Sequence, residues 1–108
     1  MNFGLTEDAL EAIRAVLVRY PEVEEAVVFG SRSLRRDHPP SDVDLALHGE
    51  VSPLDAESIA LELNDLPLPF QFDVQALAAI RHRGLRAHIA RAGQILYRKG
   101  APAAREIS

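Results

Sequence analysis

Two aspartates separated by one residue stand in the run SDVDLAL at residues 41–47. Apolar side chains alternate with them, and this period of two predicts a strand that carries Asp42 and Asp44 on one face, with their Cα atoms about 7 Å apart. Two neighbouring carboxylates without a cation would repel each other, whereas a divalent cation removes the conflict. Mg²⁺ prefers such oxygen ligands and completes its octahedron with water and substrate phosphate. The pair therefore predicts an incomplete magnesium site, to which a bound nucleotide would add the missing ligands.

A glycine followed by a serine, Gly30-Ser31, precedes this pair by ten intervening residues. Glycine lets a backbone approach a phosphate closely, and the next residues offer N–H groups at the beginning of a possible helix over residues 31–36. A third carboxylate, Asp73, lies on the polar face of a strand expected over residues 68–75. If these strands are neighbours, three acids can surround two metal ions, which activate an attacking hydroxyl and stabilise a leaving pyrophosphate.

The elements that must position these residues follow from apolar periodicity and from the placement of proline and glycine. We expect helices over residues 6–20, 52–66 and 77–92, the last one broken near Gly84, and strands over residues 25–29, 42–47, 68–75 and 94–98. The alternation predicts a single α/β domain over residues 1–98, followed by a flexible tail over residues 99–108.

The charge of the chain is unevenly distributed. Residues 1–75 hold 15 of the 16 acidic residues, whereas the residues from 76 onward hold seven of the 12 basic ones. With a net charge of −4, the chain lacks the broad basic surface of a duplex-DNA binder, so nucleic acid is not expected as a partner. The apolar runs are far shorter than the ~20 residues that span a bilayer, so no membrane association is expected. Without a signal-peptide pattern or cysteines, the expected location is cytoplasmic.

The spacing of the glycine-serine pair and the two aspartates resembles the signature of the nucleotidyltransferases related to DNA polymerase β. The stretches VVFGSR at residues 27–32 and SDVDLA at residues 41–46 look most like the minimal nucleotidyltransferase (MNT) branch of that family. FDV at residues 72–74 resembles the strand with the third acid, and GQILY at residues 93–97 resembles the usual ending. The resemblance covers roughly residues 5–98 and implies the polymerase β-like fold, an α/β (α+β) arrangement of a small mixed β-sheet flanked by helices.

In that family, residues at the positions of Asp42 and Asp44 bind two Mg²⁺ ions, and Asp73 would help to bind the ion that activates the nucleophile. Gly30 and Ser31 would hold the triphosphate of ATP. Proteins of the MNT branch are commonly paired with a helical HEPN protein as antitoxin and toxin, and they transfer AMP from ATP to a tyrosine of that partner. The resemblance therefore implies a nucleotidyltransferase that acts as an antitoxin and forms a hetero-oligomer with a HEPN-type toxin.

Each of these residues also has a simpler explanation. Gly30-Ser31 alone is an ordinary strand-to-helix turn with a capping serine. The pair Asp42 and Asp44 can blunt an exposed strand edge, and Asp73 can be an ordinary surface acid. Arg32 either binds the triphosphate or the acceptor, or it belongs to a solvated arginine cluster with its neighbours.

Two alternative functions stay open at this point. The chain can be a non-catalytic nucleotide-binding module that neutralises its partner by forming a complex, or it can transfer a nucleotide to a small-molecule acceptor. The basic stretch over residues 81–91 either attracts ATP or an acidic face of the partner, or it is simply the solvated face of a helix.

Overall fold

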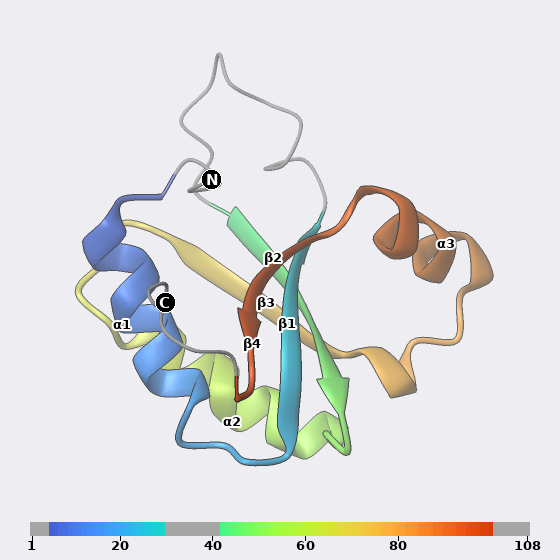
Figure 1. Cartoon of the computed structure of the whole chain (residues 1–108), viewed down its shortest axis with the longest axis horizontal. Coiled ribbons are helices and arrows are strands. Elements are labelled where there is room, and N and C mark those ends of the chain that lie inside the picture. Colours follow the sequence, from blue (N-terminus) through green and yellow to red (C-terminus); the bar gives the residue numbers. More distant parts are fainter. Residues whose placement is uncertain (1–4, 30–41, 101–108) are drawn as a thin grey trace.

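The computed structural model describes residues 5–29 and 42–100, which form one sheet with helices on both of its faces (Figure 1). The elements in chain order are α1 (Glu7–Leu17), β1 (Val23–Phe29), β2 (Asp42–Gly49), α2 (Pro53–Asn64), β3 (Gln71–Ala76), the short 3-10 helix η2 (Leu77–Ala79), α3 (Arg83–Ala92) and β4 (Gln94–Arg98). The predicted α/β class is confirmed. None of the described helices is long and apolar enough to cross a membrane.

Helices α1 and α2 begin at capping residues that the sequence supplies. At the start of α1, the Thr6 side chain accepts a hydrogen bond from the backbone N–H of Ala9 at 3.1 Å. At the start of α2, the Ser52 hydroxyl accepts from the N–H of Asp55 at 3.0 Å, and the Asp55 carboxylate accepts from the N–H of Ser52 at 3.2 Å. Since such a cap stabilises a helix by about 1 kcal/mol, both starts are encoded locally.

The sheet is mixed, and its described strands lie in the order β3-β2-β1-β4. β1 pairs antiparallel with both β2 and β4, whereas β2 and β3 run parallel. Parallel neighbours need a crossover connection, and α2 provides it between β2 and β3. As a result, β2 is an inner strand and β3 is an edge.

Two hydrophobic clusters hold the sheet between its helices, with α1 and α2 on one face and α3 on the other (Figure 1). The larger cluster joins α1 and α2 to strand residues such as Val28, Leu45 and Leu47. In the smaller one, residues of η2 and α3 and the segment between them pack on strand residues; its members are Val27, Phe29, Ala46, Leu77, Ile80 and Ile89. Burial on the second face decreases from Ala46 to Asp44 to Asp42, so this face opens toward the beginning of β2.

Strand β3 is shorter than the alternation in the sequence predicts. It begins at Gln71, and residues 66–69 form bends instead of a strand. Pro67 and Pro69 lie in these bends, and proline cannot donate a hydrogen bond to a neighbouring strand. The expectation that the strand begins at residue 68 was therefore wrong.

The helical stretch expected after β3 is interrupted earlier than Gly84. The side chain of His82 caps α3, which places Gly84 inside the first turn of that helix. The guanidinium of Arg86 donates to the carbonyls of Leu77 and Ile80 at 2.6 and 3.1 Å. These bonds satisfy backbone carbonyls at the break, which lies between η2 and α3.

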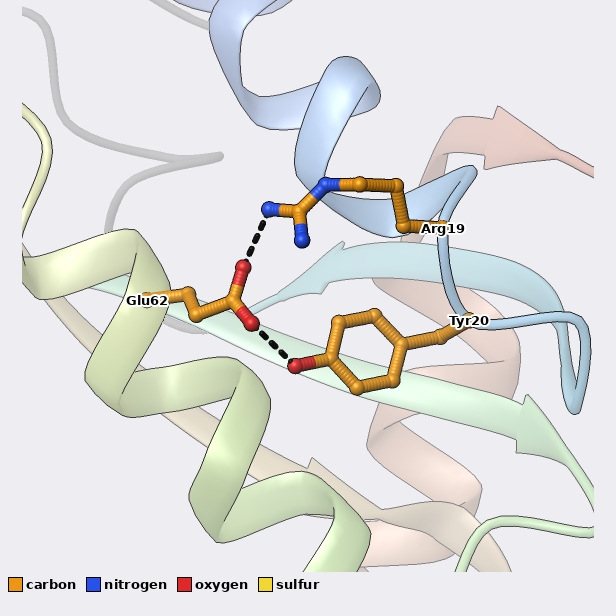
Figure 2. Close-up of polar contacts among 3 residues, drawn as sticks. All are labelled: Arg19, Tyr20 and Glu62. Carbon is orange, nitrogen blue, oxygen red and sulfur yellow. Dashed lines mark hydrogen bonds and ion pairs between the residues drawn. The ribbon is translucent and has the colours of Figure 1, made fainter.

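A polar cluster connects the chain after α1 to α2 (Figure 2). The Tyr20 hydroxyl donates to one carboxylate oxygen of Glu62 at 2.5 Å, and Arg19 donates to the other oxygen and forms an ion pair with it. The hydrogen bonds from Tyr20 and Arg19 lower the pKa of Glu62, and the bond to Glu62 raises the pKa of Tyr20. The cluster connects the end of α1 to α2, and both of these helices belong to the larger hydrophobic cluster.

The end of β2 requires a glycine. Gly49 has a φ of +124°, and a Cβ at this position would lie 2.2 Å from the carbonyl oxygen of Glu22. Gly49 is also the Cα partner of Val23, the first residue of β1. The lack of a side chain thus lets the end of β2 approach the chain entering β1.

Candidate active site

The three acids expected to act together lie at one end of one sheet face. Asp42 and Asp44 belong to β2, and their spacing of two makes both side chains project from the same face. Asp73 belongs to β3, and the parallel register makes it the Cα partner of Asp44. Gln71 is the Cα partner of Asp42. Three residues from two segments of the chain therefore meet on neighbouring strands.

The expected phosphate-binding residues Gly30, Ser31 and Arg32 lie outside the described residues. The residue before them, Phe29, ends β1 and is the Cα partner of Asp44. β1 and β2 are therefore neighbours, as the interpretation of the sequence required. Phe29, the last described residue before Gly30, therefore lies directly across from Asp44.

The other two carboxylates influence the ionisation of Asp44. Its partial burial raises the pKa of its carboxyl group above the ordinary value, and the nearby charges of Asp73 and Asp42 raise that pKa further. Burial disfavours the charged form of an acid, and like charges do the same. A cation at this end of the sheet would relieve both effects.

The donor set fits a hard divalent cation, because carboxylate oxygens are the ligands that Mg²⁺ prefers. Within the described ranges, no three His, Cys, Asp or Glu side chains form a complete metal-binding group as they stand. Mg²⁺ usually takes one or two protein carboxylates and keeps positions for water and phosphate oxygens.

Asn64, which the sequence did not single out, holds the strand that carries Asp73. Its side-chain amide donates to the carbonyl of Phe72 at 3.1 Å, and its oxygen accepts from the N–H of Phe72 at 2.7 Å. The amide thereby takes the place of a neighbouring strand at the edge of the sheet. Asn64 ends α2, and an asparagine there has no distinguishing pattern in the sequence. The two bonds anchor β3 one residue before Asp73.

The basic stretch over residues 81–91 lies on α3 and the segment before it, on the same side of the sheet as the three acids. Arg81, Arg83 and Arg91 are exposed and form no ion pair with a described residue. Arg86 differs from them, because its guanidinium is bound to two backbone carbonyls. Arg86 therefore has a structural role, whereas Arg81, Arg83 and Arg91 are exposed on the surface.

Chains of similar structure occur in solved toxin–antitoxin complexes. One comes from a complex with AMP-PNP, with 20% identity over 84% of this chain and 74% of that chain and a TM-score of 0.64. Another belongs to the MntA-HepT complex, with 18% identity, coverage of 85% and 72%, and a TM-score of 0.64. A third comes from a complex of the tri-AMPylated Shewanella oneidensis HEPN toxin with an MNT antitoxin, with 19% identity, coverage of 84% and 71%, and a TM-score of 0.64. No curated protein is a significant match.

The four-stranded mixed sheet and its helices are therefore the fold that these chains share. The sequence identifies this fold as that of a nucleotidyltransferase domain, since residues 11–101 match the family described as "Polymerase beta, Nucleotidyltransferase". This match spans most of the chain. The chain belongs to the polymerase beta nucleotidyltransferase family.

Proposed function

We propose that this chain is a Mg²⁺-dependent adenylyltransferase that transfers AMP from ATP to a tyrosine hydroxyl of a HEPN-type toxin and thereby acts as an antitoxin. The pairing of Asp44 with Asp73, with Asp42 on the same face, is the observation that carries the proposal. The partner and the nucleotide are supported by the similar complexes, of which one contains AMP-PNP and another an AMPylated HEPN toxin.

In this proposal, each candidate residue has a separate task. Asp42 and Asp44 hold two Mg²⁺ ions, Asp73 helps to hold the one that activates the acceptor, and the triphosphate is held by Gly30, Ser31 and Arg32. When bound, the ions neutralise the charge of the triphosphate and favour loss of the acceptor proton. The raised pKa of Asp44 supports this assignment, because a carboxylate that is repelled by its neighbours gains most from a nearby cation.

The chain contributes to the reaction mainly by positioning and by charge. The acceptor oxygen forms a bond to the α-phosphorus of ATP while the bond from that phosphorus to the β-phosphate oxygen breaks, and pyrophosphate leaves. Such transfer requires an in-line approach of the acceptor and stabilisation of charge on the phosphates. The carboxylates lie on two hydrogen-bonded strands, so their relative position is held by the sheet.

Transfer of label from α-labelled ATP to a purified HEPN-type toxin tests the proposal. We expect the parent chain to label the toxin in the presence of Mg²⁺, and the double variant Asp42→Asn/Asp44→Asn to lose the activity by at least about a thousandfold. The matched control is Glu11→Gln/Glu57→Gln, which removes two exposed charges from α1 and α2. This control should retain the parent rate.

A further arm of the same experiment separates transfer from binding. If the double variant still neutralises the toxin in cells as well as the parent does, the chain acts as a non-catalytic binding module. If label appears only on a small-molecule acceptor and never on the toxin, the protein acceptor is excluded. Either result would refute the proposed antitoxin mechanism.

A further inference from the structure

A groove of about 540 Å³ lies between α3 and the sheet. Its walls are mostly apolar and include Val27, Leu77, Ile89 and Ile95, with Ala87 and Ala90 at its rim. Ile95 is 46% exposed, and both alanines are exposed. Because the alanine side chains are small, they leave the groove unfilled. We call this surface the α3 groove.

The α3 groove shares a sheet face with the three acids. Alternation along β2 puts Asp42, Asp44, Ala46 and His48 on one side of the strand. His48 lines the groove, and Val27, which also lines it, is the Cα partner of Ala46. The separation between Asp44 and His48 along the strand is roughly 13 Å. A protein bound in the groove would therefore lie beside the carboxylates. One of its side chains next to the bound segment could then reach them.

The α3 side of the groove is positively charged, and Arg86 is among the lining residues. No acidic residue occurs between residues 76 and 98. On α3, Arg83 and Arg91 flank Ala87 at a spacing of four residues, so all three lie on one helix face. Arg83 and Arg91 are exposed and form no ion pair with a described residue. The surface therefore combines an apolar centre with unpaired positive charge at its edge.

We propose that the α3 groove is the docking site of the protein acceptor, which presents an apolar side chain flanked by carboxylates. This inference rests on the proposed function, since an acceptor in trans must approach the face that carries the acids. The apolar walls receive the apolar side chain, and Arg83 and Arg91 attract the flanking acids. Complementary charge of this kind orients a partner and speeds its association.

Other occupants fit the surface less well. Nucleic-acid bases are held mainly on large aromatic side chains, and the groove lining contains no Phe, Tyr or Trp. A second copy could insert α2, which exposes Leu54 and Leu61 at 70% each beside acidic residues. Because α2 and α3 cover opposite faces of the sheet, however, contact between α2 of one copy and α3 of the next is heterologous, and such contacts propagate into rings or filaments. A separate acidic protein satisfies the same chemistry without this consequence.

The test uses the full ¹⁵N-labelled chain and a synthetic peptide as the probe. The peptide is an amphipathic helix of roughly 18 residues, because shorter helices are marginal in water, with a leucine stripe flanked by glutamates. We expect saturable shifts of the backbone amides of Ala87, Ala90 and Ile95. A second peptide with lysines in place of the glutamates should bind at least about tenfold more weakly.

One variant and a matched control locate the binding. Ala87→Glu puts a bulky acid on the rim, where Arg83 and Arg91 can pair with it and preserve the helix, and it should weaken the glutamate peptide by at least about tenfold. Ala15→Glu makes the same change at an exposed position of α1, which covers the opposite face, and should leave the affinity unchanged.

Any of the following outcomes would overturn the proposal: unmoved groove amides, equal binding of both peptides, ATP shifting the same amides in place of the peptide, or self-association of the chain that Ala87→Glu abolishes. The proposed function is tested separately. Asp42→Asn/Asp44→Asn should bind the glutamate peptide at least as tightly as the parent, whether or not transfer occurs. Conversely, if Ala87→Glu modifies a HEPN-type toxin with the parent's kcat/KM, the docking site is refuted and the adenylyltransferase activity stands.

Discussion

Asp44 and Asp73 are Cα partners across the parallel pair of strands β2 and β3. The crossover through α2 brings them together from positions far apart in the chain. Partial burial raises the pKa of Asp44, and the nearby charge of Asp73 raises it further. The folded chain therefore holds a local repulsion that the unfolded chain lacks.

The first prediction is that Asp44→Asn stabilises the metal-free protein at neutral pH. The folded-state pKa of Asp44 is raised above its ordinary value of 3.8, so its contribution to stability is present below that pH and lost as the pH rises through the raised pKa. The gain in melting temperature should accordingly shrink when the pH is lowered toward 3.8. Thermal unfolding in the presence of a chelator measures it.

Addition of Mg²⁺ and ATP should reverse this order. Ligands that bind only the folded state raise its stability, so the parent should gain melting temperature and Asp44→Asn should gain little. Glu57→Gln, an exposed change on α2, serves as the control and should respond to the ligands like the parent. A lower melting temperature of Asp44→Asn in the chelator would contradict the repulsion.

The second prediction concerns Asn64. Replacement by leucine removes both hydrogen bonds to Phe72, and we expect a loss of about 1–3 kcal/mol in the free energy of unfolding. Since β3 carries Asp73, the rate of AMP transfer should also fall by roughly tenfold to a hundredfold under conditions where the variant is folded. Denaturant titration and single-turnover kinetics measure the two effects.

Two further variants separate position from stability. Asn64→Asp keeps the acceptor for the N–H of Phe72 and loses the donor to its carbonyl, so both losses should be intermediate. Ser58→Ala changes an exposed residue of the same helix and should have neither effect. If Asn64→Leu lowers stability and leaves the transfer rate of the folded protein intact, Asn64 does not position Asp73.

The third prediction compares two glycines with positive φ. Gly49→Ala should destabilise the fold by about 3 kcal/mol or more, because the new methyl group combines an unfavourable φ with a clash against the carbonyl of Glu22. Gly100→Ala should cost only about 1 kcal/mol, because its new methyl group would enter space that the described residues leave open. Chemical denaturation of the two variants in parallel measures the difference, and equal losses would rule out the clash.

The fourth prediction is a pH effect at Glu62. Its pKa in the folded state is lowered, so its contribution to stability is present above its ordinary value of 4.5 and lost as the pH falls through the lowered pKa. Tyr20→Phe removes the hydrogen bond and should move the pKa of Glu62 up toward 4.5. Carboxyl NMR titration follows the change directly. Tyr97→Phe is the control, since Tyr97 lies on β4 and is not among the groups that shift the pKa of Glu62. An unchanged pKa in Tyr20→Phe would speak against the bond.

Local features of the sequence were enough to predict most elements. The caps at Thr6 and Ser52 locate the starts of α1 and α2, and the alternation around Asp42 and Asp44 predicts β2 and their common face. These signals act over a few residues, so no tertiary information is needed. The same reasoning placed a strand at Leu68, where the two flanking prolines prevent it.

Features that depend on distant contacts were not predictable in this way. The pairing of Asp73 with Asp44 requires the strand order, and alternation within one strand does not contain that order. The break between η2 and α3 depends on the side chain of Arg86 reaching backward to the carbonyls of Leu77 and Ile80. Asn64 was missed for the same reason, because its partner Phe72 lies on another element. The roles assigned to Gly30 and the other members of the phosphate turn stay predictions.

The amide of Asn64 has a further consequence for how the molecule behaves in a crowded solution. An edge strand with free N–H and C=O groups can recruit a strand from another chain and begin aggregation. At Phe72 both groups already have a partner within the same molecule. A foreign strand would have to displace that amide before it could extend the sheet past β3, and so the border nearest to Asp73 resists growth by a fifth strand.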